Sequence, residues 1–360
     1  MKLGIVKEGN DPRVAIVPDT LPRLAALGLE VIMESGAGAD SFFFDADYFG
    51  AKVTGRKEVL AGSDIVVTYN PLPAEDRKAT AAGVVLISQF APFVDATVTE
   101  TLNAEGRKAF SMDMIPRTTL AQSMDVLSSM ASIAGYQAVL VAATKLPRYL
   151  PMLITAAGSI KPSKVLILGA GVAGLQAIAT AKRLGAVVEV FDTRQAVKEE
   201  VQSLGAKFVE VEGARDDSSA GGYAVEQSEE FLARQRAEVQ ARAVKADIII
   251  TTAQVRGKKA PILLEEETVR KMRAGSVIVD LASSTGGNCA LTKDNETIVV
   301  NGVSIIGNSQ LAAQMPQDAS FLYSNNVWHF LKTIVKDGVL KADFENEIVK
   351  GACLTPERFS

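Results

Sequence analysis

One segment near the middle of the chain limits the fold more than any other. Residues 164–194 read KVLILGAGVAGLQAIATAKRLGAVVEVFDTR, in which an apolar run is followed by Gly169, Gly171 and Gly174 and then by an amphipathic stretch. Glycines at this spacing allow a tight turn, close approach of a pyrophosphate to the backbone, and close packing of a helix on a strand. The amino end of such a helix binds phosphates. The segment therefore predicts a dinucleotide-binding strand, turn and helix.

The residues after this helix predict which dinucleotide binds. A second apolar run, residues 187–191, ends at Asp192, near the usual distance of about 20 residues from the glycines. A carboxylate there accepts a hydrogen bond from the adenosine ribose 2′-OH and repels a 2′-phosphate, so it favours NAD(H). Arg194 is an opposing feature, because an arginine nearby accommodates a 2′-phosphate. The expected cofactor contacts of this segment are Gly169, Gly171, Val172, Gly174, Asp192, Thr193 and Arg194.

The rest of the chain alternates short apolar runs with helical patterns, which is typical of α/β domains with parallel sheets. We expect strands at residues 2–6, 30–33, 64–69, 84–89, 165–168, 187–191, 246–250, 277–280 and 303–306. We expect helices at residues 20–27, 96–104, 175–184, 196–204 and 318–335. The fold class is therefore α/β, with two Rossmann-like domains, each a mostly parallel sheet flanked by helices.

The domain boundaries follow from these patterns. Residues 111–127 are polar and contain a proline, which predicts a loop that runs into a long uncharged helix. We expect an N-terminal domain of residues 1–127 that is completed by residues 319–360. Residues 128–318 then form the NAD-binding domain with its linking helix. A ligand cleft is expected between the two domains, where such clefts commonly form.

Composition excludes several classes of function. The formal net charge of -4 gives no basic surface for nucleic acid. Two cysteines and one histidine, His329, provide neither a disulfide framework nor a metal or triad cluster. The first residues lack a signal-peptide core, which predicts a cytoplasmic protein. Residues 126–144 are uncharged, but their serines, glycine and glutamine favour a buried helix over direct membrane insertion.

The opening segment KEGNDPRVAIVPDT, from Lys7, together with the glycine segment, resembles two related proteins. They are alanine dehydrogenase and the NAD(H)-binding component of proton-translocating NAD(P) transhydrogenase. The resemblance covers essentially the whole chain and leaves open which of the two reactions applies.

The segment RTTLAQSMD resembles a transhydrogenase loop with the same spacing of arginine, glutamine and aspartate. By that resemblance Arg117 and Asp125 hold the dihydronicotinamide, and Gln122 reaches toward NADP(H) on a partner component. Ser128 contacts the carboxamide, and Thr118 and Thr119 belong to the same set. A guanidinium and a carboxylate are suited to fixing an amide from two sides.

A long polar segment, residues 213–231, is rich in glycine, alanine and serine, which is typical of a mobile loop. It resembles the transhydrogenase loop whose tyrosine closes over the nucleotide, matched here by Gly222 and Tyr223. Gln235 and Gln254 match single transhydrogenase positions that contact NAD. A tolerated polar insertion is the alternative interpretation of the loop.

The chain departs from alanine dehydrogenase where that family carries a lysine and a histidine for its amino-acid substrate. The matching places hold Tyr69, or a neighbour, and Gln89. Ser284 replaces an acid of that family, and it also departs from the glutamate usual in transhydrogenases. Oxidative deamination needs a general base, which these positions do not supply.

The resemblance therefore implies hydride transfer between NAD(H) on this chain and NADP(H) on a partner component. Membrane subunits would couple the transfer to proton translocation. The implied partners are a second copy of this chain, the NADP-binding component and the membrane subunits. The chain itself is expected in the cytoplasm, attached peripherally to the inner membrane. The alternatives are an alanine-type dehydrogenase and a non-catalytic NAD-sensing subunit.

Overall fold

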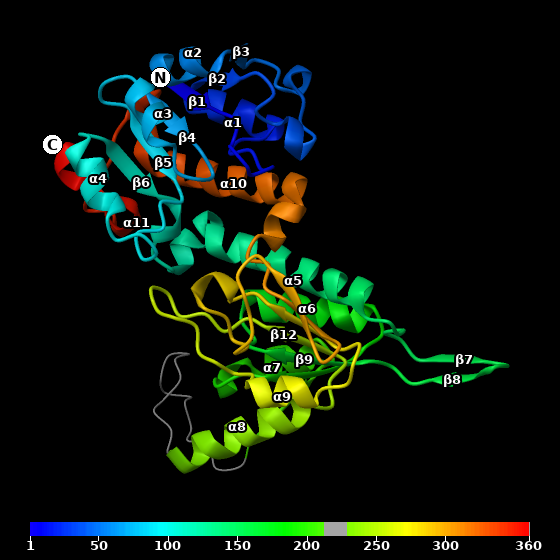
Figure 1. The fold of residues 1–360 in the computed structure, drawn as a ribbon. Coiled ribbons are helices and arrows are strands. Elements are labelled where there is room, and N and C mark those ends of the chain that lie inside the picture. Colours follow the sequence, from blue (N-terminus) through cyan, green and yellow to red (C-terminus); the bar gives the residue numbers. More distant parts are fainter. Residues whose placement is uncertain (212–228, 360) are drawn as a thin grey trace. The chain divides into compact units, whose positions relative to one another are not determined.

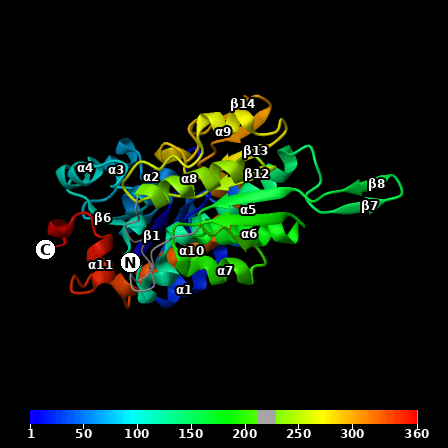
Figure 2. The same cartoon turned by 90° about the horizontal axis from the view of Figure 1, so that it is seen from below.

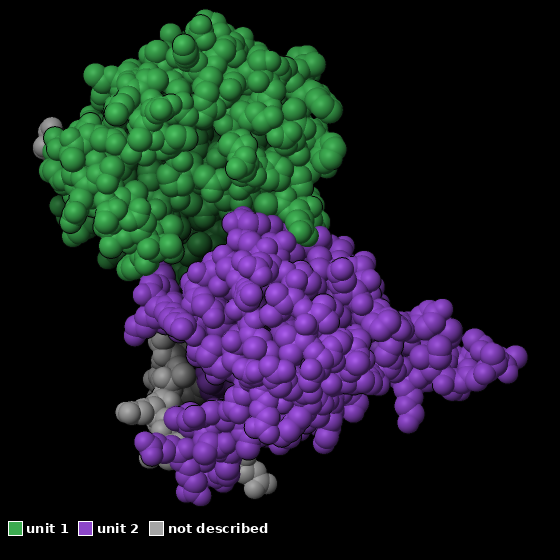
Figure 3. Space-filling model, in the orientation of Figure 1, with its two compact units in different colours: residues 1–130, 312–360 green, residues 131–311 purple. Residues whose placement is uncertain are grey.

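The computed structural model describes residues 1–211 and 229–359, which divide into two compact units. Unit 1 contains Met1–Met130 and Ala312–Ser360, and unit 2 contains Ala131–Leu311 (Figure 3). Each unit has its own parallel sheet with flanking helices, so the α/β class with two Rossmann-like domains is confirmed. The domain boundaries after residues 127 and 318, and a cleft between the domains, stay predictions.

The sheet of unit 1 has the order β3-β2-β1-β4-β5-β6, with every neighbouring pair parallel. The chain reverses direction across the sheet between β1 and β4. Ligands of open α/β sheets bind at such a switch point, beyond the carboxyl ends of the strands. The strands are β1 (Lys2–Ile5), β2 (Glu30–Glu34), β3 (Lys52–Thr54), β4 (Ile65–Val67), β5 (Val85–Ser88) and β6 (Lys108–Ser111).

Helices from both ends of the sequence complete unit 1 (Figure 1). They are α1 (Leu21–Ala26), α2 (Arg56–Gly62), α3 (Ala74–Ala79), α4 (Val98–Ala104), α10 (Pro316–Ile334) and α11 (Glu347–Ala352), with a small hairpin of β16 (Val335–Lys336) and β17 (Val339–Leu340). Helix α10 is tied to the opening segment, because the backbone N–H of Val14 donates to the Ser320 hydroxyl at 2.9 Å. The phenol of Tyr323, which is fully buried, donates to the Thr68 carbonyl at 2.7 Å.

Unit 2 has a seven-stranded sheet in the order β11-β10-β9-β12-β13-β15-β14, in which only β14 runs antiparallel to its neighbour. Its switch point lies between β9 and β12, beside the glycine turn. The strands are β9 (Lys164–Leu168), β10 (Val187–Phe191), β11 (Lys207–Phe208), β12 (Ile248–Thr251), β13 (Val277–Asp280), β14 (Thr297–Val300) and β15 (Val303–Ile306). The helices are α6 (Val172–Arg183), α7 (Lys198–Ser203), α8 (Glu229–Ala243) and α9 (Glu266–Lys271).

Alternate residues of the strands in unit 2 pack against different helices. Val165 and Ile167 of β9 join a core with residues of α5, α6 and α7. Leu166 and Leu168 of the same strand join a second core with residues of α8 and α9. Both faces are therefore buried, as a parallel sheet requires. Figure 2 shows α8 and α6 on opposite sides of the strands.

Helix α5 (Val126–Lys145) is the only one among the described residues that is long and apolar enough to cross a membrane. Its Ala138, Val139 and Ala142 are fully buried in the first core of unit 2, but only 33% of its apolar window is buried, so the expected buried helix is buried along one side only. A projecting hairpin follows it, formed by β7 (Leu153–Thr155) and β8 (Gly158–Ile160) (Figure 1). This hairpin was not predicted from the sequence.

Candidate functional site

The glycine turn of unit 2 lies between β9 and α6, as predicted. Gly169 follows the strand directly with a φ of 106°, a conformation that side chains other than glycine rarely adopt. A Cβ on Gly174 would overlap the carbonyl oxygen of Gly169, so this position requires the closest possible packing of helix on turn. Both glycines are therefore fixed by the fold itself.

Glycine at position 171 is not required by the fold. It is the N-cap of α6, and a Cβ built there meets nothing within 4 Å. The fold alone would accept a side chain at this position. The open space lies beside the unpaired N–H groups at the amino end of α6, where a pyrophosphate binds in this type of turn. The residues present therefore fit a bound dinucleotide.

Asp192 is positioned at the carboxyl end of β10, and its carboxylate is almost completely buried. It accepts hydrogen bonds from the backbone N–H of Ala170 at 2.7 Å and of Arg194 at 2.8 Å. The Arg194 guanidinium donates to both carboxylate oxygens at 3.0 Å. Burial opposes ionisation of Asp192, but the Arg194 guanidinium and the two N–H groups outweigh it and lower the pKa. Asp192 thus carries a negative charge next to the glycine turn.

Three residues that sequence reasoning did not assign complete this edge of the sheet. The Thr252 hydroxyl, after β12, donates to the carbonyls of Leu168 and Gly169 and so fixes the turn. Asp280, at the end of β13, is fully buried and accepts from the backbone N–H of Asn288 at 2.7 Å. The Asn288 side chain in turn bonds both backbone groups of Ala253. Polar residues directly after buried strands were the available signal.

The predicted nicotinamide segment, residues 117–125, lies in unit 1 within the expected loop of residues 111–127. That loop is more regular than expected, because it contains the 3-10 helices η4 (Met112–Met114) and η5 (Thr119–Met124). Asp125 follows η5, and its carboxylate accepts from the backbone N–H and the hydroxyl of Ser128 at 2.8 and 2.7 Å. Asp125 therefore caps the first turn of α5, and the structure brings Asp125 and Ser128 together.

Arg117 and Gln122 lie on the surface of the same segment, as do Thr118 and Thr119. Within residues 1–211 and 229–359, Arg117 has no ion-pair partner. Leu120 is 84% exposed, which is unusual for a leucine. The segment thus presents a guanidinium, an amide and an apolar side chain to the outside of unit 1.

The other predicted contacts are distributed over unit 2. Val172, which follows Gly171, is exposed beside the glycine turn. Thr193, which follows Asp192, is also exposed. Gln254 donates to the Leu281 carbonyl at 2.8 Å, so it is tied to the segment after β13. Gln235 is half-buried on α8. Gly222 and Tyr223 lie outside the described residues.

The switch point of unit 1 is filled by its own polar side chains. Glu8 is 5% exposed and accepts from the backbone N–H groups of Tyr69 at 2.5 Å and Asn70 at 3.1 Å. Burial raises the pKa of Glu8 to about 7, against the lowering effect of those two N–H groups. The Arg13 guanidinium is paired with Asp11 and lies 3.5 Å over the Tyr69 ring.

Tyr69 cannot easily act as a base in this cluster. Burial raises the pKa of its phenol, although the Arg13 guanidinium opposes the rise. The ring is packed 4.8 Å from that of Tyr323. Gln89 and Ser284, the other two substituted positions, carry no group that titrates near neutral pH, and Ser284 is exposed.

His329 and its neighbours on α10 are packed against aromatic and cationic side chains of unit 1. The ring centroids of Trp328 and His329 are 4.5 Å apart, and the guanidinium of Arg23 lies 4.6 Å from the centroid of the Trp328 ring. Burial, with Lys332 and Arg23 nearby, lowers the pKa of His329. Phe330 is fully buried in the core. These positions support packing rather than catalysis.

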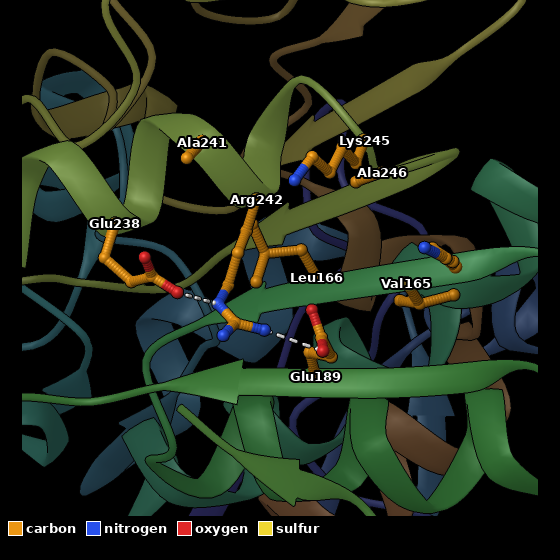
Figure 4. A pocket seen from close by; sticks show the side chains of 9 residues that line it. Val165, Leu166, Glu189, Glu238, Ala241, Arg242, Lys245 and Ala246 are labelled. Atoms are coloured by element: carbon orange, nitrogen blue, oxygen red, sulfur yellow. Dashed lines mark hydrogen bonds and ion pairs between the residues drawn. The ribbon is translucent and has the colours of Figure 1, made fainter. Parts of the chain in front are cut away.

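A pocket of about 240 Å³ lies between α8 and strands β9 and β10 (Figure 4). The Arg242 guanidinium inside it donates to Glu189 at 2.7 Å and to Glu238 at 2.6 Å. The pocket is lined by Lys164, at the amino end of β9, whereas the glycine turn is at the carboxyl end. It is therefore not the dinucleotide site, and both of its carboxylates are already paired with Arg242.

Two family models cover nearly the whole chain. The model described as alanine dehydrogenase/PNT, N-terminal domain, matches residues 4–134, and the corresponding C-terminal domain model matches residues 138–358. The chain belongs to the alanine dehydrogenase/PNT family. The two proteins that the sequence resembles therefore fall into one family. Comparison with individual relatives shows which of the two the chain resembles more.

Among members of this family, an NAD(P) transhydrogenase alpha subunit of Rhodospirillum rubrum is 44% identical over 370 aligned positions, covering 99% of this chain and 96% of the relative. The solved transhydrogenase structure from Sinorhizobium meliloti has a TM-score of 0.90 and 39% identity, covering 98% of each chain. A solved L-alanine dehydrogenase has a TM-score of 0.81 and 26% identity, covering 98% of this chain and 94% of that one. The likeness is thus greater on the transhydrogenase side.

Proposed function

We propose that this chain is the NAD(H)-binding subunit of a proton-translocating NAD(P) transhydrogenase. The observation that carries the proposal is a dinucleotide turn with open space at Gly171 in a chain whose amino-acid dehydrogenase positions hold Tyr69, Gln89 and Ser284. Hydride transfer between two nicotinamides needs orientation and exclusion of water but no general base. The high identity to transhydrogenase alpha subunits supports the same conclusion.

In this proposal unit 2 binds the nucleotide. The amino end of α6 receives the pyrophosphate, and Asp192 accepts hydrogen bonds from the adenosine ribose. Arg194 occupies the Asp192 oxygens in the structure, so it must yield at least one of them to the ribose. Bound NADH supplies the hydride from its dihydronicotinamide ring.

The segment of unit 1 from Arg117 to Asp125 then holds the nicotinamide end. Arg117 and Asp125 would fix the carboxamide with Ser128, and Gln122 would reach toward NADP(H) on the partner component. The exposure of Arg117 and Gln122 supports this role, since both side chains remain accessible to a second molecule. The capping contact of Asp125 with Ser128 keeps the carboxylate at a defined place.

The partners follow from the same proposal. An NADP-binding component docks on this chain, and membrane subunits couple hydride transfer to proton translocation. A homodimer of this chain and peripheral attachment to the inner membrane from the cytoplasm complete the assembly. The names of the relatives support the existence of further subunits, since these relatives are named as alpha subunits. The homodimer, the NADP-binding component and the membrane attachment rest on the sequence resemblance.

The rival function is an alanine-type dehydrogenase, which the solved L-alanine dehydrogenase favours by its fold. Incubation of the pure chain with NAD and L-alanine separates the two. We expect no turnover by the chain alone, and hydride exchange between NADH and an NADP analogue once a purified NADP-binding transhydrogenase component is added. Turnover of alanine would favour the rival. A pure NAD-sensing subunit would bind NADH and fail in both assays.

A further inference from the structure

Residue Asn326 of α10 connects two sides of the proposed nicotinamide segment. Its amide nitrogen donates to the carbonyl of Ser123 at 2.8 Å, and its amide oxygen accepts from the hydroxyl of Ser129 at 2.9 Å. Ser123 belongs to η5, one residue after Gln122, and Ser129 belongs to the first turn of α5. One side chain therefore holds the chain on both sides of Asp125.

The two contacts fix the orientation of this amide. A carbonyl accepts and a hydroxyl can donate, so only one placement of the nitrogen and oxygen satisfies both partners. Asn326 is 6% exposed, and a buried amide without partners would cost free energy. Helix α10 is itself anchored to unit 1 by the contacts of Ser320 and Tyr323. Asn326 thus links η5 to a rigid part of the same unit.

Besides Asn326, the segment is held by the capping contact of Asp125 with Ser128 and by its own backbone turns. Arg117, Thr118, Thr119 and Gln122 are exposed, and burial within η5 is confined to Ala121 and Met124. Hydride transfer requires the reacting atoms within about 3–3.5 Å, and a misplacement of about 1 Å can cost about 100-fold in rate. A segment that positions one ring against another therefore needs an anchor.

We infer that Asn326 is a positioning residue for hydride transfer: it fixes the segment that carries Gln122 and Asp125 without touching either nucleotide. The inference rests on the proposed function. It predicts that loss of Asn326 slows the transfer step while NADH, held mainly by unit 2, still binds.

The test uses the full chain mixed with a purified NADP-binding transhydrogenase component. The main variant is Asn326→Asp, which has the same shape, keeps the acceptor for Ser129 and loses the donor for Ser123. Asn326→Ala removes both contacts without adding charge, and Ser129→Ala removes one of them. Asn325→Asp is the matched control on the same helix: it keeps the acceptor for Arg23 and loses only an exposed donor to the Phe321 carbonyl of the same helix, so it makes the same chemical change without touching η5.

Three quantities are measured for each variant: the rate constant of hydride transfer at saturating nucleotides, the affinity for NADH by fluorescence titration, and the melting temperature. We expect Asn326→Asp and Asn326→Ala to lower the rate constant roughly ten- to 100-fold. NADH affinity should change by less than about threefold, since phosphate and ribose contacts persist. Ser129→Ala should have a smaller effect, and Asn325→Asp should match the wild type.

The outcomes distinguish the inference from the proposed function. If the wild-type chain exchanges hydride and both Asn326 variants do so at its rate, the inference is wrong although the proposed function stands. A parallel fall of rate, affinity and melting temperature would also overturn it, because it would indicate a merely structural role. If the wild-type chain itself shows no exchange, the proposed function fails, and the inference fails with it.

Discussion

Asp192 has both a structural role and a proposed role in nucleotide specificity. Its carboxylate accepts from the backbone of Ala170 in the glycine turn and is paired with the Arg194 guanidinium. The sequence identified Asp192 from its place after an apolar run. The ion pair with Arg194 could not be predicted from the sequence, because it depends on the rotamer that the arginine adopts. In the sequence Asp192 favoured NAD(H), whereas Arg194 favoured NADP(H). Because Arg194 is paired with Asp192, its guanidinium is not directed at a 2′-phosphate in this structure.

Replacing the charge at this position should change nucleotide preference. We expect Asp192→Asn to weaken NADH binding at least about tenfold, since a hydrogen bond to a charged group contributes roughly 1.5–3 kcal/mol. NADPH binding should strengthen, because the repulsion is removed and Arg194 becomes available to the 2′-phosphate. Fluorescence titration of both nucleotides measures the change, with exposed Glu199→Gln as the control. An unchanged preference would argue against Asp192 as the ribose ligand.

Glu8 gives a pH prediction. Its folded-state pKa of about 7 lies above the ordinary value of 4.5, so the folded state keeps the proton over this interval. Its contribution to the free energy of unfolding is fully present below pH 4.5 and is lost as the pH rises to 7. Relative to Glu8→Gln, the wild type should lose on the order of 3 kcal/mol between these values.

Chemical denaturation at a series of pH values tests this prediction. Glu100→Gln, which removes an exposed carboxyl of α4, is the control and should retain the wild-type slope. Parallel stability curves for the wild type and Glu8→Gln would show that Glu8 does not titrate in this range.

Gln122 is the residue assigned to the contact with NADP(H). Replacement by asparagine shortens the side chain by one methylene and leaves the amide, so reach is the property that changes. We expect hydride exchange to slow by at least about tenfold while NADH binding changes little, because only the approach of the two rings is affected. Stopped-flow exchange and NADH titration measure the two effects. An equal loss of both would contradict the bridging role.

At the scale of elements, the strongest sequence patterns predicted the structure best. The strand before the glycine turn, β10, β13 and β15 were located to within a residue or better. Strand β14 was missed although Asn301 and Gly302, both with positive φ, form the turn before β15. An Asn-Gly pair between apolar runs is a strong hairpin signal, so this strand was predictable.

Other elements carried no such signal. The hairpin of β7 and β8 is short and exposed, with Ile154 72% accessible, so no pattern of burial marks it in the sequence. The segment of the 3-10 helix η5 was expected to be a loop. Its helical turns were not predictable, because they are held by Asn326, which belongs to a helix some 200 residues away in the sequence. Long-range contacts of this kind leave no local trace in a sequence.

Substitutions of Gly174 and Gly171, the two kinds of glycine in the turn, should have different effects on stability. Gly174→Ala forces a Cβ onto the Gly169 carbonyl, so it should lower both the melting temperature and NADH affinity. Gly171→Ala meets open space, so it should leave the melting temperature nearly unchanged. NADH affinity should nevertheless fall at least about tenfold, because the new methyl group occupies the approach of the pyrophosphate.

Calorimetry and NADH titration of both variants check this contrast. Gly62→Ala, at the end of α2 where a Cβ meets only the tip of Ile32, controls for the gain of a methyl group. Undiminished NADH affinity in Gly171→Ala would show that the dinucleotide does not bind at this turn.

At the scale of the whole molecule, the α/β class and the two-domain organisation followed from the sequence, because strands of parallel sheets buried on both faces read as short, nearly continuous apolar runs that alternate with helical patterns. The switch point of unit 1 did not follow, since its filling by Glu8, Arg13 and Tyr69 depends on contacts between the segments that follow two separate strands, β1 and β4. That filling is consistent with the proposal that the pyrophosphate and ribose bind in unit 2, while unit 1 contributes only the segment from Arg117 to Ser128.

In the proposed function, the chain presents NADH for direct transfer of hydride to a second nucleotide. The most direct measurement uses NADH that carries deuterium at both C4 positions, mixed with this chain, the NADP-binding component and NADP⁺ in ordinary water. We expect NADPH that carries the deuterium and forms only when both proteins are present. NADPH that carries hydrogen from the solvent, or deuterium transfer without this chain, would contradict the proposed function.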